Sequence, residues 1–446
     1  MGLFIQIVMF VVIISVLVIL HELGHFLPAK YFKTKVEKFY LFFDVKFSLF
    51  KKKIGETVYG IGWLPLGGYV KIAGMIDESM DTDQMKEEPK PWEFRSKPAW
   101  QRLIIMLGGV TVNFLLAWVI YTFMFFNNGE TYIPVNKIEH GLHVDPVSEK
   151  IGLRTGDKIL EVDGKPVEKL DRYLSMDILF GDQIKVLRNG EEKSIALSDE
   201  GKKAALESRG RQFIVPRYTS LVIGHVQDSS NAKSSGIEVG DRLVKINNQK
   251  LEFWDEVTTQ ISNNRGKTLL FDIERDGKPM QLNVSVPVPD SLPVGIIPNR
   301  SLAEQELAIT KEYGFLSAIP RGFVETIDVL VRQVKQFKLI FNPIIQGYKQ
   351  VKGPIGIVEL MPTTWNWGFF WSFLAMFSVW LAFVNLLPIP ALDGGHVMFL
   401  LYEMISGRPP SQKVLERGQI VGFIILMGLM AVIFGNDIWN IIKRFI

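Results

Sequence analysis

The segment that most constrains this chain lies at its beginning. From Leu3 to Leu20 the sequence contains no charged residue, and this run leads directly into the motif His21-Glu22-Leu23-Gly24-His25. An apolar run of this length predicts a membrane-spanning helix. It lacks the basic start and the small-residue cleavage site of a signal peptide, so we expect it to be retained. The chain must therefore place several ionisable groups within or at the edge of a membrane.

The His-Glu-x-x-His motif indicates metal chemistry. On a helix, His21 and His25 lie four residues apart and share one face. Two imidazoles on one face can hold a zinc ion, and Glu22 can then reach a water molecule beside the metal. An alternative is a helix end whose histidines merely extend toward the membrane interface. That alternative does not explain why three ionisable groups lie at the same depth in the membrane, where each is energetically costly. The motif therefore favours a zinc hydrolase site.

Three further apolar segments predict membrane spans, at Leu103–Phe126, about Trp367–Leu387 and about Gly418–Phe434. Lysines are concentrated in the loop between Leu27 and Lys53, which contains only two acidic residues. Because basic loops stay on the cytoplasmic side, we expect the chain's beginning and its large middle region to lie outside. The histidine motif is then at the cytoplasmic end of the first span.

Composition excludes several other classes of protein. The chain has no cysteine, so disulfides and cysteine-ligated metals are excluded. Its net charge is only +3, and no patch combines basic with aromatic residues, so we expect no nucleic-acid partner.

The middle region contains an internal repeat. The stretch Gly152–Gly164 matches Gly236–Asn248, with a shared Gly-Asp pair, an alternating apolar strand and a turn. The second turn has Asn247 and Asn248 where Asp-Gly is commoner, and both residues tolerate a positive φ. The pattern resembles the signature of bacterial PDZ domains, which bind extended peptides by adding a strand to a sheet edge. A solvated β domain without a binding role is the alternative.

Two connecting regions have less specific patterns. Gly55–Ala73 is rich in β-forming residues and glycines, which predicts a short sheet lying against the membrane among the spans. The edge of such a sheet could hold a substrate strand, although an ordinary cytoplasmic hairpin fits the sequence equally well. Ala303–Lys352 has mostly helical character and predicts an amphipathic helix at the outer membrane surface or a simple connector helix.

A third metal ligand is expected far along the chain. The stretch Asn385-Leu-Leu-Pro388-Ile-Pro390-Ala-Leu-Asp393-Gly394-Gly395-His396 closes the third span on the cytoplasmic side, at the level of the histidine motif. Its prolines and glycines interrupt the helix, as happens where backbone lines a cavity. Asp393 can supply an anionic oxygen, unless it is only a turn residue or helix cap. His396 is a rival ligand, and chemistry alone does not separate the two.

The two motifs together resemble the site-2 protease family of intramembrane metalloproteases, and the tandem PDZ insertion is similar to its bacterial branch. The resemblance implies a polytopic α-helical membrane protein with four transmembrane helices, a membrane-associated β region and two inserted periplasmic PDZ domains. It implies one zinc ion per chain, held by His21, His25 and Asp393, with Glu22 as the catalytic carboxylate. It also implies that Asn385 and, in the β region, Gly67, Gly68 and Tyr69 contact the substrate. His396 is not implied as a ligand.

The function implied is regulated intramembrane proteolysis in a bacterial inner membrane. The expected partners are the lipid bilayer and single-span membrane proteins, such as an anti-sigma factor or leftover signal peptides, with a peptide or C-terminus at the PDZ domains. We expect the PDZ pair to gate substrate access. A membrane-anchored PDZ scaffold with an inactive metal site, or an ion transporter, is a competing class. The first leaves Glu22 and Asp393 unexplained, and four spans with a large external insert argue against the second.

The predicted organisation assigns each part of the chain to one region. The regions are a first span at 1–27, a cytoplasmic or membrane-associated β loop at 28–100, a second span at 101–126, PDZ domains at 127–219 and 220–300, an amphipathic linker at 301–364, a third span at 365–393, a cytoplasmic loop at 394–417, a fourth span at 418–438 and a tail at 439–446.

Overall fold

The computed structural model describes residues 1–65, 67–75, 88–145, 149–171, 173–207, 214–288, 293–299 and 307–442. The chain forms two compact units. The first comprises Met1–Gly129, Glu312–Phe337 and Tyr348–Ile446, and the second comprises Glu130–Lys311 and Lys338–Gly347.

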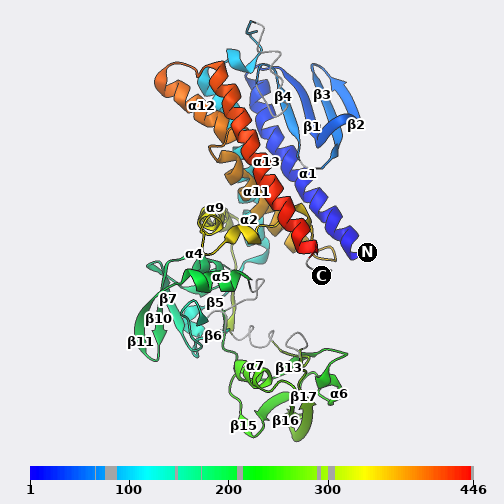
Figure 1. The fold of residues 1–446 in the computed structure, drawn as a ribbon, viewed down its shortest axis with the longest axis vertical. Helices are drawn as coiled ribbons and strands as arrows, with labels where there is room; N and C mark the ends of the chain where they lie inside the picture. Colours follow the sequence, from blue (N-terminus) through cyan, green and yellow to red (C-terminus); the bar gives the residue numbers. More distant parts are fainter. Residues whose placement is uncertain are drawn as a thin grey trace. The chain divides into compact units, whose positions relative to one another are not determined.

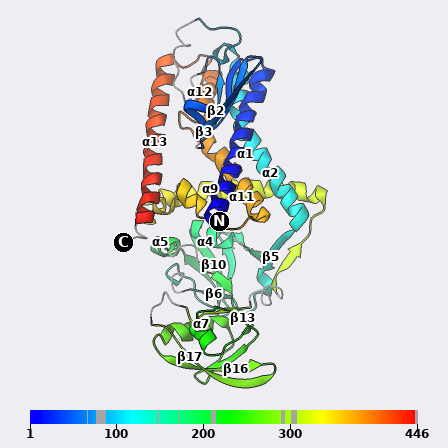
Figure 2. The same cartoon turned by 90° about the vertical axis from the view of Figure 1, so that its right-hand side faces the viewer.

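The first unit is built on four long apolar helices. They are α1 (Gly2–Tyr31), α2 (Ala99–Asn128), α11 (Trp367–Leu386) and α13 (Gln412–Ile442). In the part of the chain that the structure describes, these are the four helices long and apolar enough to cross a membrane, which confirms the predicted number of spans. Helix α13 is the least covered of them, with 11% of its most apolar stretch buried (Figure 2).

Helices α1 and α2 pack with their backbones in close approach. A Cβ atom added to Gly24 would lie only 2.4 Å from the carbonyl oxygen of Gly108. Small residues allow membrane helices to approach in this way. On the same two helices, Met9, Ile13 and Leu17 of α1 join Ala117 of α2 in one buried apolar cluster. The histidine-bearing turn of α1 is therefore held directly against α2.

A four-stranded sheet lies beside the C-terminal half of α1 (Figure 1). Its order is β2 (Phe43–Ile54), β3 (Thr57–Leu64), β1 (Val36–Leu41) and β4 (Tyr69–Ile72), with only the β1–β3 pair parallel. The predicted β region is thus confirmed, but it is larger than expected. The sheet was expected at Gly55–Ala73, within the β loop region assigned to 28–100, and β1 and β2 extend it through residues 36–54.

The fourth span is attached to the connector that precedes the third. The carboxylate of Asp437, on α13, accepts hydrogen bonds from the backbone N–H groups of Gly353, Ile355 and Gly356 at 3.0–3.2 Å. These groups belong to the first turn of α10 (Pro354–Val358), whose N–H groups lack helical partners. The residues that directly follow Lys352 therefore form the start of a short capped helix.

The second unit contains two copies of one sheet topology. In the first copy the order is β8 (Lys165–Pro166), β7 (Lys158–Val162), β10 (Gln183–Arg188) and β11 (Glu191–Ala196). In the second it is β15 (Gln249–Lys250), β14 (Arg242–Ile246), β16 (Thr268–Arg275) and β17 (Lys278–Ser285). A helix precedes the third strand of each copy, α4 (Leu174–Phe180) or α7 (Trp254–Asn263). The internal repeat of the sequence is therefore a structural duplication (Figure 1).

A second, two-stranded sheet recurs in each copy. In the first copy β6 (Leu142–Val144) pairs with β12 (Ile214–Pro216), and in the second β13 (Ile223–Val226) pairs with β18 (Ile296–Pro298). The remaining strands and α-helices described in this unit are β5 (Glu130–Pro134), β9 (Lys169–Leu170), β19 (Ile309–Lys311), α5 (Asp199–Glu207) and α6 (Asn231–Ser234).

The Gly-Asp pair of the repeat has the same role in both copies. Arg188 donates to both carboxylate oxygens of Asp157, each at 2.7 Å, and to the carbonyl oxygen of Gly152. Arg275 does the same with Asp241, at 2.7 and 2.8 Å, and with the carbonyl of Gly236. Bidentate pairs of this kind fix both groups in place. The repeated aspartates therefore hold the loop before β7 and before β14 against the sheet.

The helix expected from Ala303 begins later than predicted. Residues 300–306 lie outside the described residues, and Ile309–Lys311 is strand β19, which pairs with β5. Helix α9 starts at Phe315 and ends at Ile340. The helical prediction was wrong for 309–311 because backbone pairing with a distant strand overrides local propensity.

Helix α9 exposes several apolar residues and buries one glutamate, Glu325. Leu316, Val324 and Val331 are exposed, while Glu325 is 2% exposed and accepts a hydrogen bond from Arg321. The backbone of α9 meets α2 near Gly322, where an added Cβ would lie 2.5 Å from the Thr122 hydroxyl. The lipid-surface helix stays a prediction, in which the exposed apolar residues of α9 would be the face turned to lipid.

Candidate metal centre

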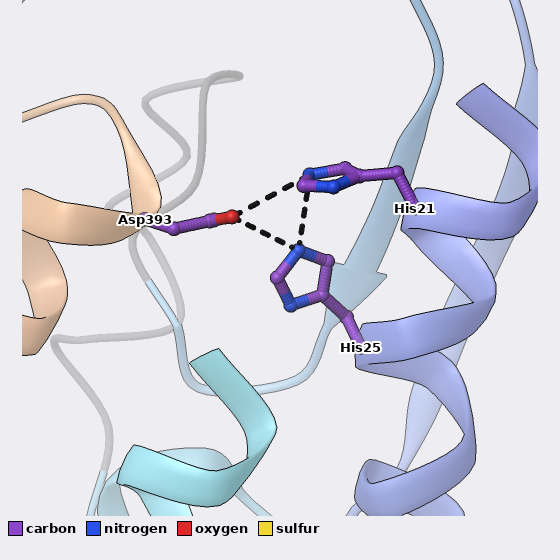
Figure 3. A group of neighbouring side chains, drawn as sticks. All are labelled: His21, His25 and Asp393. Carbon is purple, nitrogen blue, oxygen red and sulfur yellow. Dashed lines mark hydrogen bonds and ion pairs between the residues drawn. The ribbon is translucent and has the colours of Figure 1, made fainter. Parts of the chain in front are cut away.

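Three predicted ligands from the two ends of the chain meet in the first unit. His21 and His25 lie on one face of α1, and Asp393 is the first residue of α12 (Asp393–Ser406). The side chains point toward one another in Figure 3, and all three donor atoms lie within 4.8 Å of each other. Both histidines are buried, at 8% and 7% exposure. Among the described residues, this is the group of His, Asp and Glu side chains that could hold a metal ion.

The spacing of the donor atoms fits a zinc ion. The Nε2 atoms of His21 and His25 are 3.3 Å apart, and they lie 3.4 and 3.3 Å from Oδ2 of Asp393. A tetrahedral zinc site with bonds of about 2.0–2.1 Å has edges of about 3.3–3.4 Å between its ligands. The three atoms therefore form one face of such a tetrahedron, which leaves a fourth position for water.

Asp393 adds an independent indication that a cation belongs here. Its Oδ2 atom is buried and makes no hydrogen bond with any described residue. A buried carboxylate oxygen without a donor costs several kcal/mol unless a charge compensates it. The backbone before it is constrained as well, since Ala391 has a φ of +82° and a Cβ at Gly395 would lie 2.5 Å from Cα of Pro390. The fold therefore holds this carboxylate in place at an energetic cost that a cation would remove.

Helix α2 supplies the contacts on the far side of both imidazoles. His25 donates from Nδ1 to the carbonyl oxygen of Ile105 at 2.9 Å, and Nδ1 of His21 lies 3.1 Å from Nδ2 of Asn113. A Cβ at Gly109 would lie 2.4 Å from Nε2 of His25, so only glycine leaves room for the rings. Sequence reasoning missed Gly109 and Asn113. A signal existed, because Asn113 is the only amide or charged residue between Leu103 and Phe126.

The other predicted site residues are distributed around this cluster. Glu22 is half-buried on α1 between the two histidines. Asn385, near the end of α11, places Nδ2 at 3.2 Å from Nε2 of His21, so it borders the cluster. His396 does not join it, since its Nε2 lies 3.0 Å from Nε2 of Gln419 on α13. The structure thus brings Asp393, rather than His396, to the two histidines.

The predicted β-region contacts lie at an edge of the sheet. Gly68 packs so closely that an added Cβ would lie 2.5 Å from the side chain of Val18, which precedes His21 by one turn of α1. Tyr69 begins β4, an edge strand of the described sheet, and stacks on Tyr40 at a centroid distance of 5.3 Å. Gly67 has a φ of +153°. The backbone of this segment, rather than the Tyr69 ring, is therefore the part placed at the level of the cluster.

Comparisons with known proteins agree with the geometry. The sequence pattern of peptidase family M50 matches residues 9–429. Protease RseP of Yersinia pestis is 30% identical over 459 residues, covering 96% of this chain and 97% of the relative. The regulator of sigma-E protease RseP of Escherichia coli is 30% identical over 456 residues, with the same coverage of 96% and 97%. A Vibrio cholerae relative, whose name includes the words zinc metalloprotease, is 28% identical over 460 residues, covering 96% and 97%.

These matches run through all four apolar helices and both motifs, and they confirm the resemblance to RseP-type site-2 proteases that the motifs predicted. They also confirm zinc as the metal and proteolysis as the reaction. The chain therefore belongs to peptidase family M50 and is a membrane-embedded zinc metalloprotease.

Proposed function

We propose that His21, His25 and Asp393 hold one zinc ion, and that the chain uses it to hydrolyse peptide bonds within or near the spans of single-span membrane proteins. One observation carries the proposal. Three donor atoms from opposite ends of the sequence lie 3.3–3.4 Å apart, on helices that meet within the apolar unit. The same ligand set on a water-soluble helix would indicate an ordinary peptidase, whereas here α1 is itself a candidate span.

The reaction assigns separate tasks to the chain's own groups. When bound, zinc lowers the pKa of a water molecule toward neutrality and stabilises negative charge on the carbonyl oxygen. Glu22 takes the proton from the attacking water, whose oxygen bonds to the peptide carbonyl carbon. Glu22 then returns that proton to the nitrogen of the leaving amine as the C–N bond breaks. Asn385, which borders the cluster, donates its amide hydrogen bond to the substrate backbone.

The substrate must be extended to reach the site. A membrane-spanning helix hides its carbonyl groups in hydrogen bonds from residue i to i−4, so it must unwind locally before attack. Strand addition to the edge that contains Gly67, Gly68 and Tyr69 would satisfy the backbone groups that unwinding frees. We assign these residues to substrate binding through their backbone.

The direct test uses the purified full-length chain and a single-span substrate protein. Cleavage is expected with bound zinc and is expected to stop on addition of a zinc chelator. The Glu22→Gln variant should retain zinc and lose cleavage, since it keeps the shape of the side chain but not the base. Full cleavage by Glu22→Gln would refute the role of Glu22. Cleavage that continues in the presence of the zinc chelator would refute the proposal as a whole. The absence of cleavage together with transport of ions would also refute it.

The choice of the third ligand has its own test. Asp393→Ala should lose zinc, whereas His396→Ala should keep it, because His396 faces Gln419 and not the cluster. Metal analysis of both purified variants reads out the difference. Unchanged zinc in Asp393→Ala would contradict the assignment and return His396 to consideration.

We further propose that the two repeat copies are PDZ domains on the extracytoplasmic side of an inner membrane, where they gate access for substrates. Two observations support this proposal. The sheet topology is duplicated, and each copy ends on a strand of its two-stranded sheet, β12 in the first copy and β18 in the second. As substrates we propose an anti-sigma factor or leftover signal peptides; the Escherichia coli relative is named regulator of sigma-E protease. Deleting residues 129–298 should increase cleavage of an untrimmed substrate with a bulky external domain. If cleavage instead stops, exclusion is not the main role of the pair.

A further inference from the structure

The amide of Asn113 is placed against the ring of His21 on the side away from the other ligands. Asn113 is fully buried near the middle of α2, at 0% exposure. Its Nδ2 atom lies 3.1 Å from Nδ1 of His21, and its Oδ1 atom makes no hydrogen bond with any described residue. A buried amide within an apolar helix is costly, so a functional reason for it is expected.

The proton on His21 decides which amide atom must face the ring. Nε2 is the ring nitrogen that lies 3.4 Å from Asp393 Oδ2, so it is the one that would ligate a metal. A neutral imidazole that ligates through Nε2 carries its proton on Nδ1, and that N–H needs an acceptor. The amide nitrogen cannot accept, whereas the amide oxygen can. Because the two atoms of an amide are nearly indistinguishable in shape, a half-turn of the Asn113 amide places Oδ1 beside the ring.

The neighbouring ligand already shows this arrangement. Nδ1 of His25 donates to an oxygen of α2, the carbonyl of Ile105, at 2.9 Å. Helix α2 also brings the backbone of Gly109, one turn after Ile105, within hydrogen-bonding reach of His21. The amide oxygen of Asn113 would be a side-chain acceptor for the same ring, from the same helix. Such outer contacts fix the tautomer and orientation of metal-ligating histidines.

We propose that Asn113 is a positioning residue for the metal centre: its Oδ1 accepts the hydrogen bond from Nδ1–H of His21 and holds this histidine in the tautomer that ligates through Nε2. This inference rests on the proposed role of His21 as a ligand. Loss of such an outer contact typically weakens metal binding by about 10–100-fold.

Competition with a chromophoric chelator measures zinc affinity on the purified full-length chain. Asn113→Leu removes the acceptor at similar volume and is expected to weaken zinc binding by about 10–100-fold. Asn113→Asp keeps an oxygen acceptor and is expected to bind zinc within a few-fold of the unaltered chain, or more tightly. Ser378→Ala is the matched control, because Ser378 donates to the backbone oxygen of Asn113 at 2.7 Å and leaves its amide untouched.

Three results would overturn the inference. The first is an unchanged zinc affinity in Asn113→Leu. The second is an equal loss of zinc affinity in Asn113→Leu and Asn113→Asp. The third is a loss in Ser378→Ala as large as that in Asn113→Leu, which would indicate an effect of helix packing alone. If Asn113→Leu does not fold, the ¹⁵N spectrum of the histidines in the zinc-loaded, unaltered chain decides instead. A proton on Nδ1 of His21 supports the inference, and a proton on Nε2 overturns it. If the unaltered chain itself binds no zinc, both this inference and the proposed function fail. That outcome can be distinguished from the others, in which the unaltered chain does bind zinc.

Discussion

Buried aspartates occur in both units of this protein, in opposite circumstances. In the second unit, Asp157 and Asp241 are each 1% exposed, and each receives two hydrogen bonds from an arginine and one from a backbone N–H. In the first unit, Asp393 Oδ2 is also buried but makes no hydrogen bond with the described residues. The nearest partners of that oxygen are two imidazole nitrogens at 3.3 and 3.4 Å.

The contrast separates a carboxylate that the fold fully satisfies from one that we propose as a metal ligand. A buried charge with a complete set of donors stabilises the loop that carries it. A buried charge held without donors is a source of strain that only a bound cation, or the loss of the charge, relieves. The aspartates of the repeat copies thus have all their partners within the fold, whereas the Asp393 carboxylate still lacks one that a bound cation would supply.

The largest expected effect is at the unsatisfied carboxylate. Asp393→Asn keeps the shape of the side chain and removes the anionic ligand. Because loss of an outer contact alone weakens metal binding by about 10–100-fold, loss of a ligand should weaken zinc binding by more than about 100-fold and abolish cleavage. Chelator competition and substrate cleavage measure both. The metal-free variant should unfold at a temperature no lower than that of the metal-free parent chain. A markedly lower unfolding temperature of the variant would show that Asp393 stabilises the fold as Asp157 and Asp241 do, and would contradict the contrast between the two units.

The satisfied carboxylates should respond in the opposite way. Asp241→Asn leaves Arg275 without its charge partner and is expected to destabilise the second copy by about 2 kcal/mol, less than for a fully buried pair. The expected loss of stability is smaller than for a fully buried pair because the Arg275 side chain is 22% exposed to water. Hydrogen–deuterium exchange of β14 and β16 in the full-length chain measures this, with the half-buried Asp272→Asn as the control. Loss of zinc binding in Asp241→Asn would contradict the assignment of a structural role to Asp241 and a metal-binding role to Asp393.

A smaller effect is expected from the space around the histidines. Gly109→Ala would place a Cβ 2.4 Å from His25 Nε2, so the rings must shift and zinc affinity should fall about 10-fold, at the lower end of the effect of a disturbed outer contact. Gly428→Ala on α13 is the matched control, because its added Cβ would meet no described atom within 4 Å. Equal affinities of the two variants would show that the rings are not confined by α2.

The smallest effect concerns a surface pair of the second unit. Lys338 donates to Asp182 at 2.7 Å, and this hydrogen bond lowers the pKa of Asp182 below its ordinary value of 3.8. Because the pKa is lowered in the folded state, the pair stabilises above about pH 4 and this stabilisation is lost as the pH falls through the lowered pKa. Both side chains are more than 60% exposed, so Lys338→Ala should cost no more than about 0.5 kcal/mol at neutral pH, and less in high salt. Urea titrations at pH 7 and pH 3 measure this; an undiminished effect at pH 3 would contradict it.

Much of this architecture could be predicted from local sequence. The four spans follow from long apolar runs, and the pairing of His21 with His25 follows from helical spacing. The strands at residues 36–54 were not predicted individually, although Phe43, Val45, Phe47 and Leu49 alternate with polar residues as a strand does. Strand β19 was missed because its pairing with β5 joins residues far apart in the chain.

The grouping of the candidate ligands could be predicted from the sequence, but most of their surroundings could not. Asp393 and His396 lie three residues apart, and only the start of α12 at Asp393 decides which of them reaches the histidines. Asn113 stands out in the sequence as an amide in an apolar span, but its contact with His21, like that of Gly109 with His25, depends on how α2 packs against α1. The outer contacts of a site made by three separate helices require the tertiary structure.

The central claim is that two imidazoles and the Asp393 carboxylate surround one zinc ion. X-ray absorption at the zinc edge, on the purified full-length chain, tests it most directly. The account predicts one zinc per chain with two imidazoles and oxygen ligands at about 2.0–2.2 Å, a spectrum that changes in Asp393→Asn and stays the same in His396→Ala. A site with three imidazoles, or a spectrum that Asp393→Asn leaves unchanged, would contradict it.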